Sequence, residues 1–331
     1  MLSSPSEEDL VVKWLFAEAI NYRNKGKPTH NPGALKWASK TRIHKIIFSV
    51  LEEFDIPVTR SWYMWGGFVH SEELDAHFAN LRNDYSRNPT RTLGLRQKVH
   101  DIGVPTAAIK NSLEKRVDEV TSMPSKDFLL IYYKNESPLP YRPLYVAKQE
   151  ISNFLDDIGG RGSPGILLDR GRKLGDCITR FHESSLMQFD DTPLKETTFA
   201  FTDLLENALD KLTLLTERRQ KISNEKLSFF CDAKSVFDDF VWSPYACEIS
   251  QNTVKGIRAL SEKAKMKYQK ERKISQAPAK LADLQNKLVE KKLEFSYEEI
   301  QALKETTFKE EKGAKALSEL IGIYSRGNNG E

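Results

Sequence analysis

The chain has 331 residues, and its 50 lysines and arginines nearly balance its 47 aspartates and glutamates, which leaves a formal net charge of +3. This balance excludes a global attraction to nucleic acid or to an anionic membrane, so any polyanion binding must come from local patches. The 17 Phe, 11 Tyr and 5 Trp residues exclude disorder as the main state, because disordered chains lack such aromatic content.

The cysteines and the apolar runs indicate the compartment. Three cysteines lie far apart without a Cys-x-x-Cys pair, which is typical of free thiols in a reducing environment. No apolar run approaches the roughly 18 residues that span a bilayer, and the first residues lack the basic start and apolar stretch of a signal peptide. We therefore expect a cytoplasmic protein that does not bind membranes.

The first part of the chain predicts helices around one β-hairpin. A helix begins at Ser4-Pro5-Ser6-Glu7, where a capping serine precedes a proline at the first helical position. A loop rich in proline and glycine follows at 26–33, and then a second helix at about 34–54. Aromatic and β-branched residues flank Gly66-Gly67 within 61–70, which predicts a tight hairpin or a bent extended segment, followed by a short helix; we adopt the hairpin.

The rest of the chain predicts further helices. One covers about 106–121, whereas the apolar run 128–133 fits a strand or a helix equally. Prolines at 138, 140 and 143 place a boundary between a helical domain with the hairpin at 1–137 and a second helical domain at 138–331. There we expect a helix at 144–158 that ends at Gly159-Gly160, a loop at 159–175, a long helix from Thr192, an aromatic connection at 239–250, and two or three amphipathic helices over 252–324. The predicted fold class is mainly α, a multi-helix protein with a small β-hairpin.

No pattern predicts a catalytic, metal or nucleotide site. The six histidines are scattered without a His-x-x-x-His pair, and the glycines at 159–165 lack the lysine of a phosphate-binding loop. Gly-x-Ser-x-Gly is absent as well. We therefore expect no catalytic residue, no metal ligand and no cofactor. Acidic residues such as Glu150 and Asp169 leave open an effector nuclease whose site is invisible in the sequence.

Two basic stretches predict a nucleic-acid interface as an alternative function. The first lies within 81–100, and the second is a helix near 255–273 on which Ile257, Leu260, Ala264 and Tyr268 form an apolar stripe and leave a basic outer face. Such a face contacts phosphates in a salt-sensitive way. The hairpin would then be the wing of a winged-helix-like regulator. The candidate nucleic-acid-binding residues are Arg82, Arg87, Arg91, Arg96, Lys98, Lys263, Lys267 and Lys270.

Three segments resemble a known family. Lys45-Ile46-Ile47-Phe48, Pro57-Val58 and Trp65-Gly66-Gly67-Phe68-Val69 follow the order of the Panacea domain of SocA-like antitoxins, over roughly residues 40–135. That family has a Lys-Leu-Leu-Tyr-like helix, a Gly-x-Pro-Ile/Leu segment, an aromatic strand ending in Tyr-Gly-Pro-Val, and a helix. This sequence departs from it at Asp55, where glycine is favoured, and at Gly67-Phe68, which replaces the proline.

The resemblance implies a helical interaction domain that neutralises or assembles with a partner protein, often encoded beside it. It implies no catalytic residues. We therefore predict a non-enzymatic protein–protein interaction component of a toxin–antitoxin or antiviral defence system. The candidate partner-binding residues are Trp62, Tyr63, Trp65 and Phe68.

Overall fold

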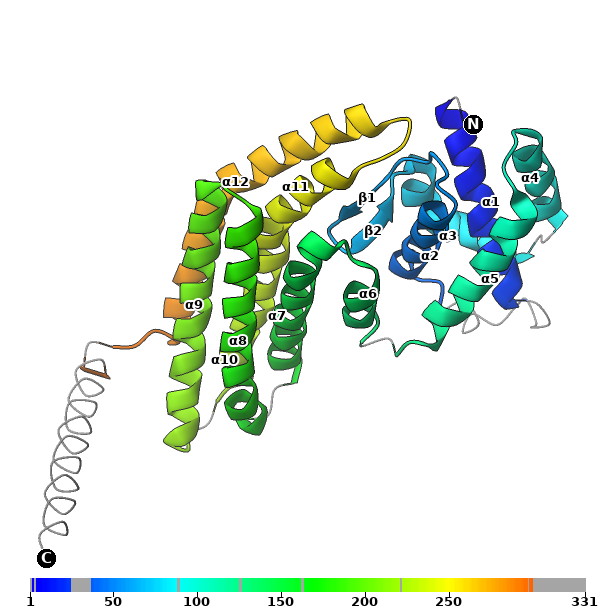
Figure 1. Cartoon of the computed structure of the whole chain (residues 1–331). Helices are drawn as coiled ribbons and strands as arrows, with labels where there is room; N and C mark the ends of the chain where they lie inside the picture. The colour runs from blue at the N-terminus through cyan, green and yellow to red at the C-terminus, as the bar shows by residue number, and fades with distance from the viewer. Residues whose placement is uncertain are drawn as a thin grey trace, which may run out of the picture.

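The computed structural model describes residues 2, 4–24, 37–87, 90–124, 127–161, 164–220, 222–296 and 298–299, without the side chains of 73, 86–87, 160–161 and 164–172. Helices dominate these residues, and a two-stranded antiparallel hairpin is the one sheet among them (Figure 1). The prediction of a mainly α protein with a small β-hairpin is confirmed. None of the helices within these ranges combines the length and the apolarity that a bilayer crossing requires.

The N-terminal elements surround α1. They are α1 (Pro5–Asn24), α2 (Lys40–Glu53), β1 (Arg60–Tyr63), β2 (Gly66–Val69), α3 (Glu72–Arg87), α4 (Thr90–Asp101) and α5 (Thr106–Ser122). The amide of Glu7 donates to the Ser4 hydroxyl at 3.4 Å, which is the predicted cap. Trp14 and Leu15 are fully buried where α1 packs against α3, α4 and α5. The predicted loop at 26–33 lies outside the described residues.

The hairpin lies between the two ends of the molecule. Arg60 pairs with Val69 and Tyr63 with Gly66, with the turn at 64–65. β2 packs on α2, whereas β1 packs on α11 from the far end of the chain. Arg60 also forms an antiparallel bridge with Lys255. The hairpin is therefore covered on both sides and does not project as a wing.

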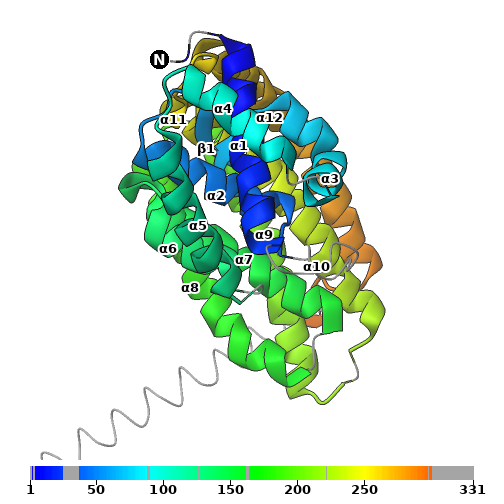
Figure 2. The ribbon, with the colours of Figure 1, turned by 90° about the vertical axis from the view of Figure 1, so that its right-hand side faces the viewer.

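The second half of the chain forms a helical bundle, seen on the left of Figure 1 and behind α1, α4 and α5 in Figure 2. Its long helices pack against one another, and the first half of α12 continues past the bundle along α11. The elements are α6 (Phe128–Glu136), a short 3-10 turn η2 (Leu139–Tyr141), α7 (Arg142–Arg161), α8 (Pro164–Gln188), α9 (Thr192–Glu217), α10 (Asn224–Val236), a π-helical turn η3 (Phe237–Trp242), α11 (Ser243–Thr253) and α12 (Ala259–Glu290).

Three expected connections are helical instead. α7 continues through Gly159 to Arg161. A Cβ at position 159 would lie 2.6 Å from Cys231 Sγ on α10, so glycine permits the close approach of these two helices. α8 occupies most of the expected loop at 159–175. The stretch 239–250 is covered by η3 and α11, with Pro244 in the first turn of α11, where proline is tolerated. Of the two or three helices expected over 252–324, the structure describes one, α12, up to 290, and the region beyond 299 lies outside the described residues.

The domain boundary at 137/138 stays a prediction. Residue 137 lies between α6 and η2. One continuous cluster of buried apolar side chains runs from Leu2 to Leu293, so the two halves share a core.

Candidate functional site

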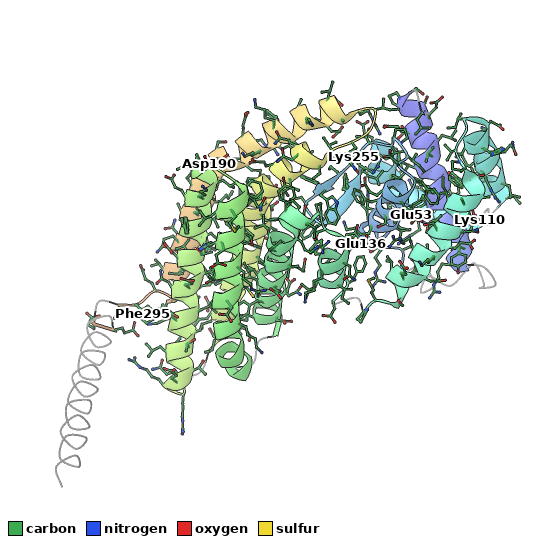
Figure 3. The ribbon with its side chains drawn as sticks, in the orientation of Figure 1. Glu53, Lys110, Glu136, Asp190, Lys255 and Phe295 are labelled. Atoms are coloured by element: carbon green, nitrogen blue, oxygen red, sulfur yellow. The ribbon has the colours of Figure 1, made fainter. Side chains whose placement is uncertain are left out.

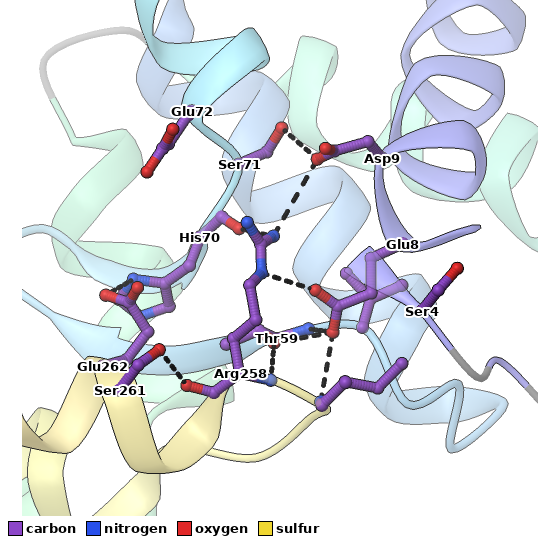
Figure 4. Close-up of polar contacts among 12 residues, drawn as sticks. Ser4, Glu8, Asp9, Thr59, His70, Ser71, Glu72, Arg258, Ser261 and Glu262 are labelled. Atoms are coloured by element: carbon purple, nitrogen blue, oxygen red, sulfur yellow. Dashed lines mark hydrogen bonds and ion pairs between the residues drawn. The ribbon is translucent and has the colours of Figure 1, made fainter. Parts of the chain in front are cut away.

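A buried carboxylate on α1 binds the hairpin to the connection between α11 and α12. Glu8 is fully buried, and its Oε1 accepts from the Thr59 amide at 2.8 Å, from the Thr59 hydroxyl at 2.6 Å and from the Ile257 amide at 3.1 Å. Its Oε2 accepts from Arg258 Nε at 2.7 Å (Figure 4). These four donors compensate the cost of burying the charge, which is otherwise several kcal/mol.

Arg258 extends this network to the end of the hairpin. Its Nη2 donates to the carbonyl of His70 at 2.6 Å and lies 3.9 Å from the Asp9 carboxylate. Asp9 in turn accepts from the Ser71 hydroxyl at 3.3 Å (Figure 4). The guanidinium therefore contacts α1 and the exit of β2 at the same time, which fixes the start of α12 against both.

Ser61, His70 and Glu262 are arranged like the hydroxyl–imidazole–carboxylate relay that activates a serine nucleophile. Ser61 Oγ lies 2.7 Å from His70 Nε2, and His70 Nδ1 lies 3.2 Å from Glu262 Oε2. In a neutral ring, an Nδ1–H that donates to Glu262 leaves Nε2 to accept the serine proton, which is the order used for serine activation. No sequence pattern indicates this group, because Ser61 and His70 lie at the hairpin and Glu262 lies on α12.

Burial closes this relay to a substrate. Ser61 is 1% exposed, and its hydroxyl also lies 2.7 Å from Ser250 Oγ on α11, so the position that an attacked carbonyl would need is filled by protein. The hydrogen bond from His70, together with Lys265, lowers the pKa of Glu262 to about 2. The group therefore joins the hairpin to α11 and α12 through a charged carboxylate.

Two buried lysines lie on the other side of the hairpin. Lys45 Nζ donates to the carbonyl of Gly67 at 3.0 Å, and Lys148 Nζ lies 3.3 Å from Asp238 and 4.0 Å from the centre of the Trp65 ring. Burial, followed by the charge of Lys148, lowers the pKa of Lys45 to about 7. Burial also lowers the pKa of Lys148 to about 8, although Asp238 opposes the shift. Such amines are nucleophilic when a substrate can reach them, and here both are closed off.

The two buried thiols, and the acidic residues in the part of the chain that the structure describes, form no further cluster of reactive groups. Burial raises the pKa of Cys177 and of Cys247 to about 11, so both remain thiols at neutral pH. No three His, Cys, Asp or Glu side chains converge as metal ligands among these residues. Glu150 Oε2 lies 2.7 Å from Arg180 Nη2 in an ion pair. The side chain of Asp169 is not among those that the structure describes.

A groove of about 730 Å³ opens beside the hairpin, with Phe48 and Trp62 among its lining residues. Its charged rim is paired internally. Glu52 contacts Arg60 at 2.5 Å and Lys255 at 3.1 Å, and Arg116 contacts Glu136 at 3.3 Å. Figure 3 shows Glu53, Glu136 and Lys255 at this junction of the two halves. The rim charges neutralise one another, so the groove presents no clear preference for an anion or a cation.

The four aromatic residues predicted to bind a partner lie at different depths. Trp62 is 5% exposed and packs with Phe48, Tyr132 and Tyr145, so it fills the core rather than presenting a surface. Tyr63 and Phe68 are half-buried. Trp65, at the turn, is 38% exposed.

The residues predicted to bind nucleic acid are not brought together. Those of the first basic stretch belong to α3 and α4, at the end of the molecule opposite the bundle (Figure 1). Of these, Arg91 and Lys98 are exposed, Arg82 and Arg96 are half-buried, and the side chain of Arg87 lies outside the described part. The second group lies on α12.

On α12 one of the residues predicted to contact phosphates is paired with acids. Lys270 lies 2.6 Å from Asp191 and 2.6 Å from Glu248, so neighbouring helices neutralise it. Lys263 and Lys267 remain exposed, without an ion pair to any residue in the described ranges.

The apolar stripe predicted to face inward on α12 faces the solvent. Leu260 is 85% exposed and Tyr268 is 65% exposed, with Ala264 exposed between them and Ile257 in the preceding connection. The inward face instead carries Met266, Ala277, Leu284 and Leu288 together with Glu262. A sign of the buried acids was available in the sequence: Glu8 lies one turn before Val11 and Val12 on the apolar side of α1, and Glu262 lies one turn before Met266.

Comparison with known proteins identifies the family. The model of a family described as a domain of unknown function (DUF8098) matches residues 1–320. The chain belongs to the DUF8098 family. No curated protein and no solved structure matches it. The DUF8098 match spans both halves of the chain, and its description gives no activity, so the function is inferred from the structure itself.

Proposed function

We propose that this DUF8098 protein is a non-enzymatic component that binds a partner protein in a toxin–antitoxin or antiviral defence system. The observation that carries the proposal is the exposed apolar row on α12, where Leu260 is 85% exposed and Tyr268 is 65% exposed. Single exposed apolar residues are common, but a row of them on one helix face marks an interaction site.

The internal polar groups support the same function. Glu8, His70, Glu262 and Lys45 form hydrogen bonds or ion pairs that join elements within the chain, and Lys148 lies 3.3 Å from the carboxylate of Asp238. Polar groups used in this way stabilise the scaffold that presents the surface.

The defence setting is supported by the resemblance to the Panacea domain. The segments that carry it form α2, the connecting residues 56–58, the hairpin and then α3. This is the order of helix, middle segment, aromatic strand and helix in that family. The proposal places the partner contact on α12 instead of on Trp62, because Trp62 is buried.

The test is the state of the full chain in its native host. We expect the tagged protein, expressed at its natural level, to be recovered in a discrete complex with one other polypeptide and to suppress that polypeptide's toxicity on co-expression. Native mass spectrometry and a growth assay measure these two results. Recovery of the protein alone, with turnover of a small substrate or metal-dependent cleavage of nucleic acid, would contradict the proposal.

Nucleic-acid binding is the alternative that this experiment also separates. Lys263 and Lys267 are exposed on the same helix and favour it. A mobility shift at low salt that weakens steeply as salt is added would support it over a protein partner.

A further inference from the structure

We infer that the outer face of α12 binds an acidic amphipathic helix of the partner protein, an inference that rests on the proposed function. The outer face consists of Leu260, Ala264 and Tyr268 with the flanking basic residues Lys263, Lys267 and Arg272. It lies on the part of α12 that extends beyond the bundle (Figure 1).

The shape of this face fits a helix. Leu260, Ala264 and Tyr268 follow one another at four-residue spacing, so they form one row about 12 Å long at a rise of 1.5 Å per residue. The apolar row of a second helix would pack along this row, as in other pairs of amphipathic helices.

The charges of this face identify the partner's chemistry. On a helical projection Lys263 and Lys267 lie on one flank of the row, and Arg272 lies on the other. These three residues are exposed, with no ion pair to the residues that the structure describes, whereas Lys265, Lys270 and Lys273 of the same helix are paired with acids. A helix with acidic residues on both sides of an apolar row would satisfy both flanks.

Two other occupants fit less well. A second copy of this chain, docked about a two-fold axis, would oppose the basic flanks to each other and give like-charge repulsion. Nucleic acid could contact the three unpaired cations, although the acidic Glu271 lies among them. It would leave Leu260 and Tyr268 without apolar contact over most of their surface.

Site-specific photocrosslinking of the full chain in its host tests the inference. The photoreactive residue p-benzoylphenylalanine replaces Ala264, and in the control it replaces Asn207, an exposed residue of α9. We expect an adduct at 264 and not at 207. Mass spectrometry should map it to a partner segment with apolar residues at helical spacing flanked by aspartates or glutamates.

Charge variants then test the recognition. Lys263→Glu with Lys267→Glu should reduce the yield of the adduct about tenfold, as should Tyr268→Ala. Lys134→Glu, which changes an exposed lysine on α6, should leave the yield unchanged. Circular dichroism confirms that each variant is folded.

The outcomes separate this inference from the proposed function. If the partner complex is recovered but residue 264 yields no adduct, or an adduct to a neutral or basic segment, to nucleic acid, to lipid or to a second copy, the inference is wrong and the proposed function stands. If no partner complex is recovered, the proposed function fails and the inference fails with it.

Discussion

Arg258 Nε donates to the carboxylate of Glu8 at 2.7 Å, although the two residues lie 250 positions apart in the chain. The contact closes the structure on itself, because it joins the first turns of α1 to the start of α12 beside the end of the hairpin. It also orients the helix whose outer face we propose to bind the partner. The loss of this contact therefore affects both stability and the position of α12.

Replacing Glu8 by glutamine tests the contribution of this carboxylate. Glu8→Gln keeps the size of the side chain but turns an amide group toward the donors of Thr59, Ile257 and Arg258. We expect the free energy of unfolding to fall by about 3–5 kcal/mol, the range for breaking a buried ion pair, measured by urea denaturation. The neighbouring Asp9→Asn is the matched control, because Asp9 is part-exposed and 3.9 Å from the same guanidinium. A loss of at most about 1 kcal/mol is expected there.

Glu262 predicts how stability depends on pH in the acid range. Its pKa is held at about 2 in the folded protein, first by the hydrogen bond from His70, whereas an unfolded glutamate titrates near about 4.3. A lowered carboxylate pKa gives stability that is present above about pH 4.3 and is lost as the pH falls toward 2. Glu262→Gln should flatten the decline in urea midpoint between pH 5 and pH 2.5. An equally steep decline in the variant would show that other acids cause it.

How far the sequence predicts this structure is seen on α1 and α12. The apolar spacing of Val11, Trp14 and Leu15 predicted a buried face, and the structure buries it. The same spacing of Leu260, Ala264 and Tyr268 predicted a buried face that is exposed instead. Periodicity shows only that apolar residues share one side of a helix; whether another element covers that side depends on the packing of distant segments.

The partners of the buried acids were beyond prediction for the same reason. Ser61 and His70 are nine residues apart, but Glu262, Ser250 and Arg258 come from elements at the other end of the chain. No local motif encodes such a group. The hairpin itself was predictable from its aromatic residues and glycines, but its turn lies at 64–65, and Gly66 and Gly67 belong to β2.

Gly256 controls how closely the α11–α12 connection approaches the hairpin. Its φ is +108°, and a methyl group there would overlap the backbone of Thr59 and Val58. We expect Gly256→Ala to lower the free energy of unfolding by about 2–4 kcal/mol, from backbone strain and overlap together. Gly175→Ala in α8 is the control, since no described atom lies within 4 Å of the added carbon and alanine favours helix by about 0.5–1 kcal/mol. The melting temperatures of the two variants should shift in opposite directions, down for Gly256→Ala and up for Gly175→Ala.

The buried lysines predict a second effect of pH, above neutrality. In the folded chain the pKa of Lys45 is about 7 and that of Lys148 about 8, whereas unfolded lysines titrate near about 10.4. Between these values the unfolded chain binds more protons than the folded chain, so the free energy of unfolding should rise with pH. We expect the urea midpoint of the wild-type protein to increase from pH 7 to pH 9, below the range in which unfolded tyrosines ionise.

Lys45→Met separates this effect from other titrations. The variant keeps an unbranched side chain of similar length but has no amine, so its urea midpoint should rise less between pH 7 and pH 9 than that of the wild type. The remaining rise would come from Lys148. Lys134→Met removes an exposed lysine of α6 and should leave the wild-type slope unchanged. If Lys45→Met also kept the full slope, Lys45 would have to remain protonated inside the fold. A charge beside the hairpin would then need a counter-ion closer than Asp238, the carboxylate that pairs with Lys148.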